Sequence, residues 1–297
     1  MSLSIEKKDQ IRDMLGNYCD RYPSIEKAAN SLNHVSQTTV YNILRSKYDS
    51  IRDQMFRTLR NQIEPLVCPQ REWALVQTPT FKDVHFCLRD AHLNNNVTWL
   101  VAPSGSGKTV TAEAYVRENK NVFYVLCDED MGKTDFVAEL AKSVGLKIAS
   151  GRRRREKLLA VLDEIGDLDN ALIILDEGDK LRDDVLCYFI TIYNRLREKA
   201  GIVFLSTPYI KTRIESSLNR QKKGFEEIHS RIDRNYYNAD LNTENDVYAI
   251  CKANGIEDEK MIQSIISDTA RYGYDLRRVK KRVKAMRDKA ANRIEVE

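Results

Sequence analysis

The sequence predicts an α/β protein whose core is a parallel sheet covered by helices, preceded by a small all-helical domain. Three observations support this prediction. Helical and strand-like patterns alternate from about residue 80 onward, as a parallel sheet requires. Two strand-like runs, Ala171–Leu175 and Gly201–Leu205, are continuously apolar, which is typical of strands covered on both faces. The first 63 residues, by contrast, show helical patterns with turn signals between them.

Length and composition favour a soluble protein with more than one domain. The chain has 297 residues, of which 42% are hydrophobic, so it can form two or three domains with their own cores. It has no run of about 18 apolar residues and no apolar signal segment at its start, so we expect a cytoplasmic protein that does not enter a membrane. Its six cysteines form no C-x-x-C pair, which argues against zinc and against a disulfide framework.

Changes in composition divide the chain into four segments. Residues 1–63 are predicted to form the helical domain, and residues 64–79 a linker, because this stretch holds three of the six prolines. Residues 80–238 contain the alternating patterns of the α/β core. Residues 239–297 are helical again and are predicted to form a separate C-terminal helical domain.

The N-terminal segment contains a helix-turn-helix pattern. Its first helix is expected to end at Gly16–Asn17, and Ser36 can cap a later helix after a turn. The start of that later helix, Gln37, Thr38 and Thr39, would face the major groove of double-stranded DNA, because Gln can read base edges and Thr can bind phosphates. A three-helix bundle used for protein contacts is the alternative.

The chain also contains a phosphate-binding loop. The segment Ala102-Pro103-Ser104-Gly105-Ser106-Gly107-Lys108-Thr109 lies between an apolar strand pattern and a helical pattern, the context that such a loop requires. Gly105 and Gly107 let backbone N–H groups and the helix N-terminus face a polyphosphate. Lys108 would contact the β- and γ-phosphates of ATP, and Thr109 would ligate Mg²⁺.

Ala102 departs from the full motif, which has a glycine at this position. Alanine tolerates positive φ poorly. The sequence therefore leaves two possibilities, an ordinary φ at Ala102 or slight strain in the loop.

A second part of the predicted nucleotide site follows a buried strand. Asp176 and Glu177 come directly after Ala171–Leu175, and ligands of open α/β sheets bind beyond the carboxyl ends of the strands. Asp176 would hold Mg²⁺ through water, and Glu177 would polarise the water that attacks ATP. A solvated helix N-terminus is the alternative.

The order of these parts resembles the core of the AAA+ ATPases. The phosphate loop is followed by the strand that ends in Asp176–Glu177, and then by a strand that ends in Ser206 and Thr207. The resemblance implies that the protein is an ATPase. It also implies that Thr207, or else Ser206, is the sensor 1 residue that helps to hold the attacking water.

Two further arginines match AAA+ positions. Arg231 resembles the arginine finger, which would complete the ATP site of a neighbouring subunit by neutralising charge on the transferred phosphate, and Arg234 is the alternative. The C-terminal segment resembles the AAA+ helical lid. Within it, Arg277 matches the sensor 2 arginine, which responds to the γ-phosphate.

The combination of helix-turn-helix domain, proline-containing linker, compact AAA+ core and minimal lid resembles the target-DNA adaptor ATPases of transposition systems. The resemblance implies ATP-dependent assembly into a filament on double-stranded DNA with little sequence preference, and regulation of a transposase. A replication-type helicase loader or initiator is one alternative. A transcription regulator with a nucleotide switch is another, although Glu177 and Arg231 argue against a passive switch.

An arginine cluster is the main candidate for DNA contact within the core. Arg152, Arg153, Arg154 and Arg155 are adjacent, between two predicted helices. Four neighbouring guanidinium groups repel one another and gain little from packing, so neutralising DNA phosphates is a plausible use. Contact with an acidic protein is the alternative.

Overall fold

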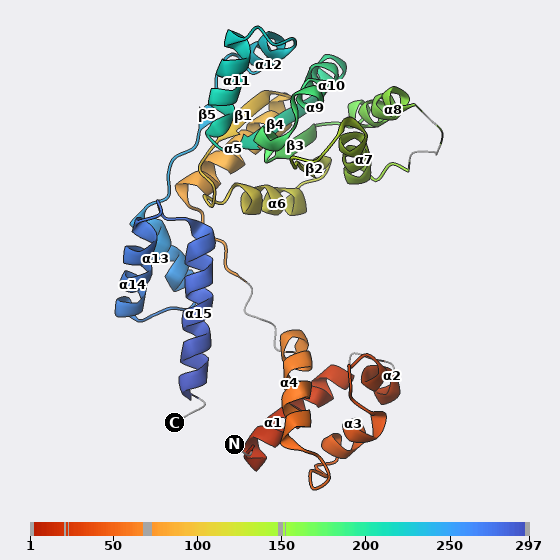
Figure 1. Cartoon of the computed structure of the whole chain (residues 1–297), viewed down its shortest axis with the longest axis vertical. Helices are drawn as coiled ribbons and strands as arrows, with labels where there is room; N and C mark the ends of the chain where they lie inside the picture. Colours follow the sequence, from red (N-terminus) through yellow and green to blue (C-terminus); the bar gives the residue numbers. More distant parts are fainter. Residues whose placement is uncertain are drawn as a thin grey trace. The chain divides into compact units, whose positions relative to one another are not determined.

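The computed structural model describes residues 3–20, 22, 24–67, 73–147, 151 and 153–294. The chain divides into two compact units, Met1–Trp73 and Ala74–Glu297 (Figure 1). None of the described helices combines the length and the apolarity needed to cross a membrane.

The described part of the N-terminal unit is helical. Its helices are α1 (Ile5–Cys19), α2 (Ile25–Asn30), α3 (Gln37–Leu44) and α4 (Asp53–Val67). Ser36 caps α3 as predicted, since its Oγ accepts a hydrogen bond from the Thr39 N–H at 3.1 Å. The prediction that α1 ends at Gly16–Asn17 is wrong. The helix continues because Tyr18 and Cys19 are buried against the other helices, and this packing outweighs the local stop signal.

The second unit is built on a sheet of five parallel strands in the order β2-β3-β4-β1-β5, which confirms the predicted parallel sheet (Figure 1). The strands are β1 (Val97–Val101), β2 (Val122–Leu126), β3 (Ala171–Asp176), β4 (Ala200–Ser206) and β5 (Tyr237–Asn238). Every residue of β3 and β4 is buried, as their continuous apolar runs indicated.

Helices cover both faces of this sheet. Leu172 and Ile174 of β3 pack with α5 and α6, whereas Ile173 and Leu175 pack with the helices of the opposite face. The helices of the core are α5 (Pro79–Asn94), α6 (Lys108–Glu118), α7 (Lys133–Val144), α8 (Arg154–Gly166), α9 (Asp183–Leu186), α10 (Tyr188–Leu196), α11 (Tyr209–Asn219) and α12 (Phe225–Arg231). A turn at Cys187 separates α9 from α10.

Three helices complete the second unit, α13 (Glu244–Ala253), α14 (Glu259–Ala270) and α15 (Leu276–Ile294). Their shared core includes Val247, Ile262 and Val279, each fully buried. The first residue of α15 reaches the phosphate loop, because the Leu276 N–H donates a hydrogen bond to the Gly105 carbonyl at 2.8 Å. This contact brings the C-terminal helices to the candidate site.

Candidate nucleotide site

The loop between β1 and α6 has the backbone conformation that close approach of a phosphate requires. Gly105 and Gly107 have φ values of +75° and +108°, which side chains disfavour. Ala102 is buried and does not have a positive φ. Its N–H donates to the Ser206 carbonyl at 3.1 Å and so extends the pairing of β1 with β4. Of the two possibilities for Ala102, the ordinary φ is therefore the correct one.

The polar groups of this loop fit a polyphosphate. The buried Lys108 ammonium donates to the carbonyls of Ala102 and Pro103 at 2.7 and 2.8 Å. No carboxylate of the described residues forms an ion pair with it, and burial lowers the pKa of Lys108 despite the nearby charge of Asp176. The buried Ser106 hydroxyl also has no hydrogen-bond partner among the described residues. Phosphate oxygens would compensate the ammonium charge and the hydroxyl donor.

The start of α15 closes over the same loop. Asp275 caps the helix by accepting a hydrogen bond from the Arg277 N–H at 2.8 Å, and its carboxylate occupies the space that a Cβ on Gly105 would need. The Arg277 guanidinium donates to the Ser104 hydroxyl at 3.2 Å. The predicted sensor 2 residue thus lies beside the loop.

Asp176 is the last residue of β3 and Glu177 follows it, and β4 lies between β3 and β1 in the sheet. Asp176 is completely buried and accepts hydrogen bonds from the Tyr124 hydroxyl and the Glu177 N–H, both at 2.9 Å. Burial, reinforced by the charge of Asp176, raises the pKa of Tyr124 and keeps the phenol protonated. Glu177 has a φ of +55°, and its carboxylate forms an ion pair with Lys180.

The two candidates for the sensor 1 position differ in their surroundings. Ser206 is fully buried, and its hydroxyl accepts a hydrogen bond from the Trp99 indole N–H at 2.8 Å. The half-buried Thr207 instead donates its hydroxyl hydrogen bond to the Asp179 carboxylate, in the turn that follows Glu177. The geometry favours Thr207.

Arg231 lies near the amino ends of the strands, at the end of the sheet opposite the phosphate loop. It lines a cavity of about 440 Å³ together with Val97 and Ala200, the first residues of β1 and β4. The phosphate loop follows the other end of β1, so Arg231 cannot contact the loop of its own chain. Its guanidinium donates to the Asn194 side chain at 3.1 Å. Arg234, the alternative finger, forms an exposed ion pair with Glu226 at 2.7 Å.

The candidate DNA contacts in the core lie apart from the nucleotide site. Arg152 falls outside the described residues. Arg153 and Arg155 are exposed at the start of α8. Arg154 differs from them, because its Nε donates to the Tyr188 hydroxyl at 2.9 Å.

The candidate contacts in the N-terminal unit lie at the start of α3. Gln37 and Thr38 are exposed there. The Thr39 hydroxyl is 2.8 Å from the Ser36 hydroxyl, so it takes part in the cap of the helix. Gln37 and Thr38 are therefore the freer pair for contact with a ligand.

Several residues that contact the candidate site were not predicted from the sequence. Tyr124 holds Asp176, Asp179 holds Thr207, and Arg213 of α11 contacts the turn that contains Asp179. One signal was available for Tyr124, because a tyrosine within a covered strand needs a partner for its hydroxyl. Asp179 and Arg213 follow no local motif.

Two comparisons define the class of the core. Residues 92–214 match the family model described as an AAA domain. The fold is similar to that of the Aeropyrum pernix ORC1 protein solved in complex with DNA, with a TM-score of 0.52 and 17% identity over 71% of this chain and 60% of that chain. Together with the parallel sheet and the phosphate loop, these findings show that residues 92–214 are similar to an AAA domain and that the core has a fold of the AAA+ type.

Within this class, the chain resembles the ATP-dependent target DNA activator B of Escherichia phage Mu. The two are 27% identical over 159 residues, which are 51% of this chain and 49% of the relative. The Mu-like prophage FluMu DNA transposition protein B of Haemophilus influenzae is 22% identical over 207 residues, or 69% of each chain. This chain thus spans about half the length of the phage Mu relative that it matches.

Proposed function

We propose that this chain is an ATP-hydrolysing AAA+ protein that assembles on target DNA, with little sequence preference, and regulates a transposase. The observation that carries the proposal is that three other parts of the chain meet at the phosphate loop and its Lys108. They are the end of β3 with Asp176 and Glu177, the end of β4 next to Thr207, and the start of α15 with Arg277. The role of DNA and of a transposase is inferred from the names of the two relatives, a target DNA activator and a DNA transposition protein.

ATP binding would use the loop and the lid together. The backbone N–H groups of residues 104–109 and the Lys108 ammonium would hold the phosphates. Arg277 would contact the γ-phosphate from α15, which makes the position of the lid sensitive to the nucleotide. Thr109 and Asp176 would hold Mg²⁺, which supplies positive charge between the phosphates when it is bound.

Hydrolysis would use Glu177 and Thr207. The Glu177 carboxylate accepts a proton from the water as the water oxygen attacks the γ-phosphorus, and ADP leaves with the bridging oxygen. For this step Glu177 must turn from Lys180 toward the water. Thr207, held by Asp179, would position that water.

Assembly would depend on ATP because each site needs an arginine from a second subunit. Arg231 lies near the amino ends of its own strands, away from its own phosphate loop. It would therefore neutralise the phosphate charge of ATP bound to a neighbouring subunit. In the assembly, Arg153 and Arg155 would contact DNA phosphates. The N-terminal helical unit would form a second DNA-binding domain, joined through the linker to the core and the lid.

Electron microscopy of the protein with duplex DNA, with and without ATP, tests this proposal. We expect continuous filaments on DNA when ATP is present and none when it is absent. Closed rings or isolated particles would favour the helicase loader or initiator. ATP-independent binding to a defined sequence would favour the transcription regulator.

A further inference from the structure

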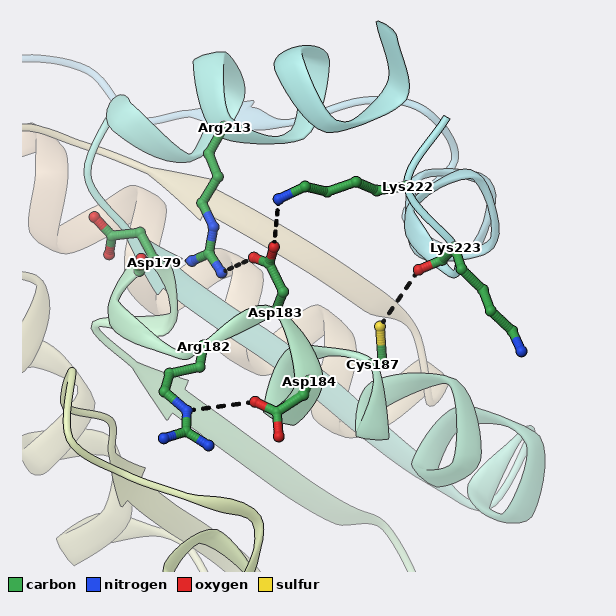
Figure 2. Close-up of polar contacts among 8 residues, drawn as sticks. All are labelled: Asp179, Arg182, Asp183, Asp184, Cys187, Arg213, Lys222 and Lys223. Atoms are coloured by element: carbon green, nitrogen blue, oxygen red, sulfur yellow. Dashed lines mark hydrogen bonds and ion pairs between the residues drawn. The ribbon is translucent and has the colours of Figure 1, made fainter. Parts of the chain in front are cut away.

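Polar contacts connect the turn at Asp179 with the start of α9 and with α11, and Figure 2 shows Arg213 and Lys222 reaching Asp183. At the centre of these contacts is Arg213 of α11, whose side chain is only 15% exposed. Its Nη1 donates to the Asp179 carbonyl at 2.8 Å, and its Nη2 donates to the Asp183 carboxylate at 2.5 Å. Lys222 donates to the other oxygen of Asp183 at 2.8 Å. One guanidinium thus joins the turn to the start of α9.

The turn itself is short and tightly enclosed. It consists of the 3₁₀ segment η1 (Gly178–Lys180), which begins directly after Glu177. A Cβ added to Gly178 would lie 3.0 Å from the Phe204 ring, so β4 packs closely against one side of the turn. Arg213 holds the Asp179 carbonyl, while the Asp179 carboxylate holds Thr207. The position of Asp179 therefore affects both the water-polarising carboxylate and the sensor residue.

We propose that Arg213, oriented by Asp183, is a positioning residue for ATP hydrolysis, which it supports by holding the turn between Glu177 and Asp179 in its working place. This inference rests on the proposed function, because it assigns no contact between Arg213 and ATP. A planar guanidinium can donate to a carbonyl and a carboxylate at once in fixed directions, which a lysine ammonium does not reproduce. A shift of the turn by about 1 Å would be enough to slow the chemical step strongly.

Asp183 is suited to hold this guanidinium. Burial favours a raised pKa for Asp183, but the hydrogen bonds from Arg213 and Lys222 outweigh burial, so its pKa is lowered and the carboxylate is charged at neutral pH. Lys222 is more exposed than Arg213, with 45% of its side chain accessible. Exposed ion pairs contribute little to stability, so Lys222 holds Asp183 in place less strongly than Arg213 does.

The experiment compares Arg213→Ala and Arg213→Lys with Arg195→Ala. Arg195 is a matched control, since it forms an equally close ion pair with Asp163 at 2.5 Å but lies on α10 away from the turn. We expect kcat for ATP hydrolysis to fall about tenfold or more in both Arg213 variants, with KM and ATP affinity changed less than about twofold. Added guanidinium ion should restore part of kcat in Arg213→Ala.

A second measurement is hydrogen exchange of the turn amides without nucleotide. The Lys180 N–H donates to the Glu177 carbonyl at 2.9 Å. The amide hydrogen of Lys180 should therefore exchange faster in Arg213→Ala but not in Arg195→Ala. Unchanged kcat in both Arg213 variants, or an equal loss in Arg195→Ala, would overturn the inference. A parent protein without ATPase activity would contradict the proposed function instead, and the exchange rates would still decide whether Arg213 holds the turn.

Discussion

Asp176 is a buried carboxylate whose direct partners are neutral groups. Within the described part of the chain it forms no ion pair, and its partners are the Tyr124 hydroxyl and the Glu177 N–H. Neutral donors stabilise a buried charge without cancelling it. In the proposed site, this arrangement would leave the Asp176 carboxylate available to Mg²⁺.

Tyr124→Phe tests this view of Asp176. The substitution removes one donor from a buried carboxylate, so we expect a loss of about 1–3 kcal/mol in the free energy of unfolding. We also expect a changed Mg²⁺ concentration for half-maximal ATPase activity, since the carboxylate is less well oriented. Urea unfolding and a Mg²⁺ titration measure the two effects. If both remain unchanged, Tyr124 does not hold Asp176.

Glu177→Gln tests the assignment of the water-polarising residue. Gln has nearly the same shape but cannot accept the proton, so kcat should fall about 10²- to 10⁴-fold while ATP binding persists. Complexes with DNA should then outlive those of the parent. Glu164→Gln, on the exposed face of α8, is the control. A hydrolysis rate equal to that of the parent would show that the assignment is wrong.

At the scale of elements, the phosphate loop and the start of α15 are in direct contact. Gly105 has no room for a Cβ, because the Asp275 carboxylate already fills that space. The Leu276 N–H adds a hydrogen bond to the Gly105 carbonyl. A ligand that changes the loop must therefore also affect the lid helix.

Gly105→Ala tests this contact, with Gly145→Ala as a matched control. The two glycines have φ values of +75° and +77°, but a Cβ at Gly145 meets nothing within 4 Å. Both variants should lose about 1 kcal/mol of stability from the backbone. Only Gly105→Ala should lose ATP affinity, by about tenfold or more, because its Cβ displaces Asp275 and α15. Equal ATP affinity in the two variants would contradict the coupling.

The start of α8 is a second element with a predicted role. Arg153 and Arg155 are its exposed cations, whereas Arg154 is bound to Tyr188. The double substitution Arg153→Ala and Arg155→Ala should weaken ATP-dependent DNA binding. It should also reduce the slope of log affinity against log salt by about two, or one for each lost phosphate contact. Arg195→Ala should leave this slope unchanged, and an unchanged slope in the double variant would exclude α8 from the interface.

At the scale of the whole molecule, the proposed function places parts of two different catalytic sites on one chain. Lys108 and Glu177 lie at the carboxyl edge of the sheet, and Arg231 lies beside the amino ends of β1 and β4. A heterologous interface would bring the two edges together and repeat without closing, which gives a filament. Under the proposed function, the sheet would thus provide a physical reason for ATP-dependent assembly.

Mixing two inactive variants tests this arrangement. Lys108→Ala lacks the phosphate-binding lysine, and Arg231→Ala lacks the finger, so each alone should hydrolyse little ATP. In an equal mixture, about a quarter of the interfaces would join an intact Lys108 to an intact Arg231, and activity should return in that proportion. Mixing either variant with a chain that carries both Lys108→Ala and Arg231→Ala should restore nothing. Failure of the first mixture to recover would argue against Arg231 as the finger.

Much of the fold was predictable because its signals are local. The phosphate loop and the strand Ala171–Asp176 can each be recognised from consecutive residues. Continuous apolar runs predict the buried strands. Helix ends were less predictable. The α1 helix continues past Gly16, because contacts with distant elements decide where a helix stops.

By itself, the sequence predicted an AAA+-like core, and it placed a phosphate loop, an acidic pair and a lid arginine in it as candidate site residues. Only the tertiary structure decided which groups surround them. Tyr124 reaches Asp176 across 52 residues, and Arg213 reaches Asp179 across 34, because the order of strands and helices brings these segments together. Such partners follow from packing in three dimensions, and no spacing along the chain encodes them.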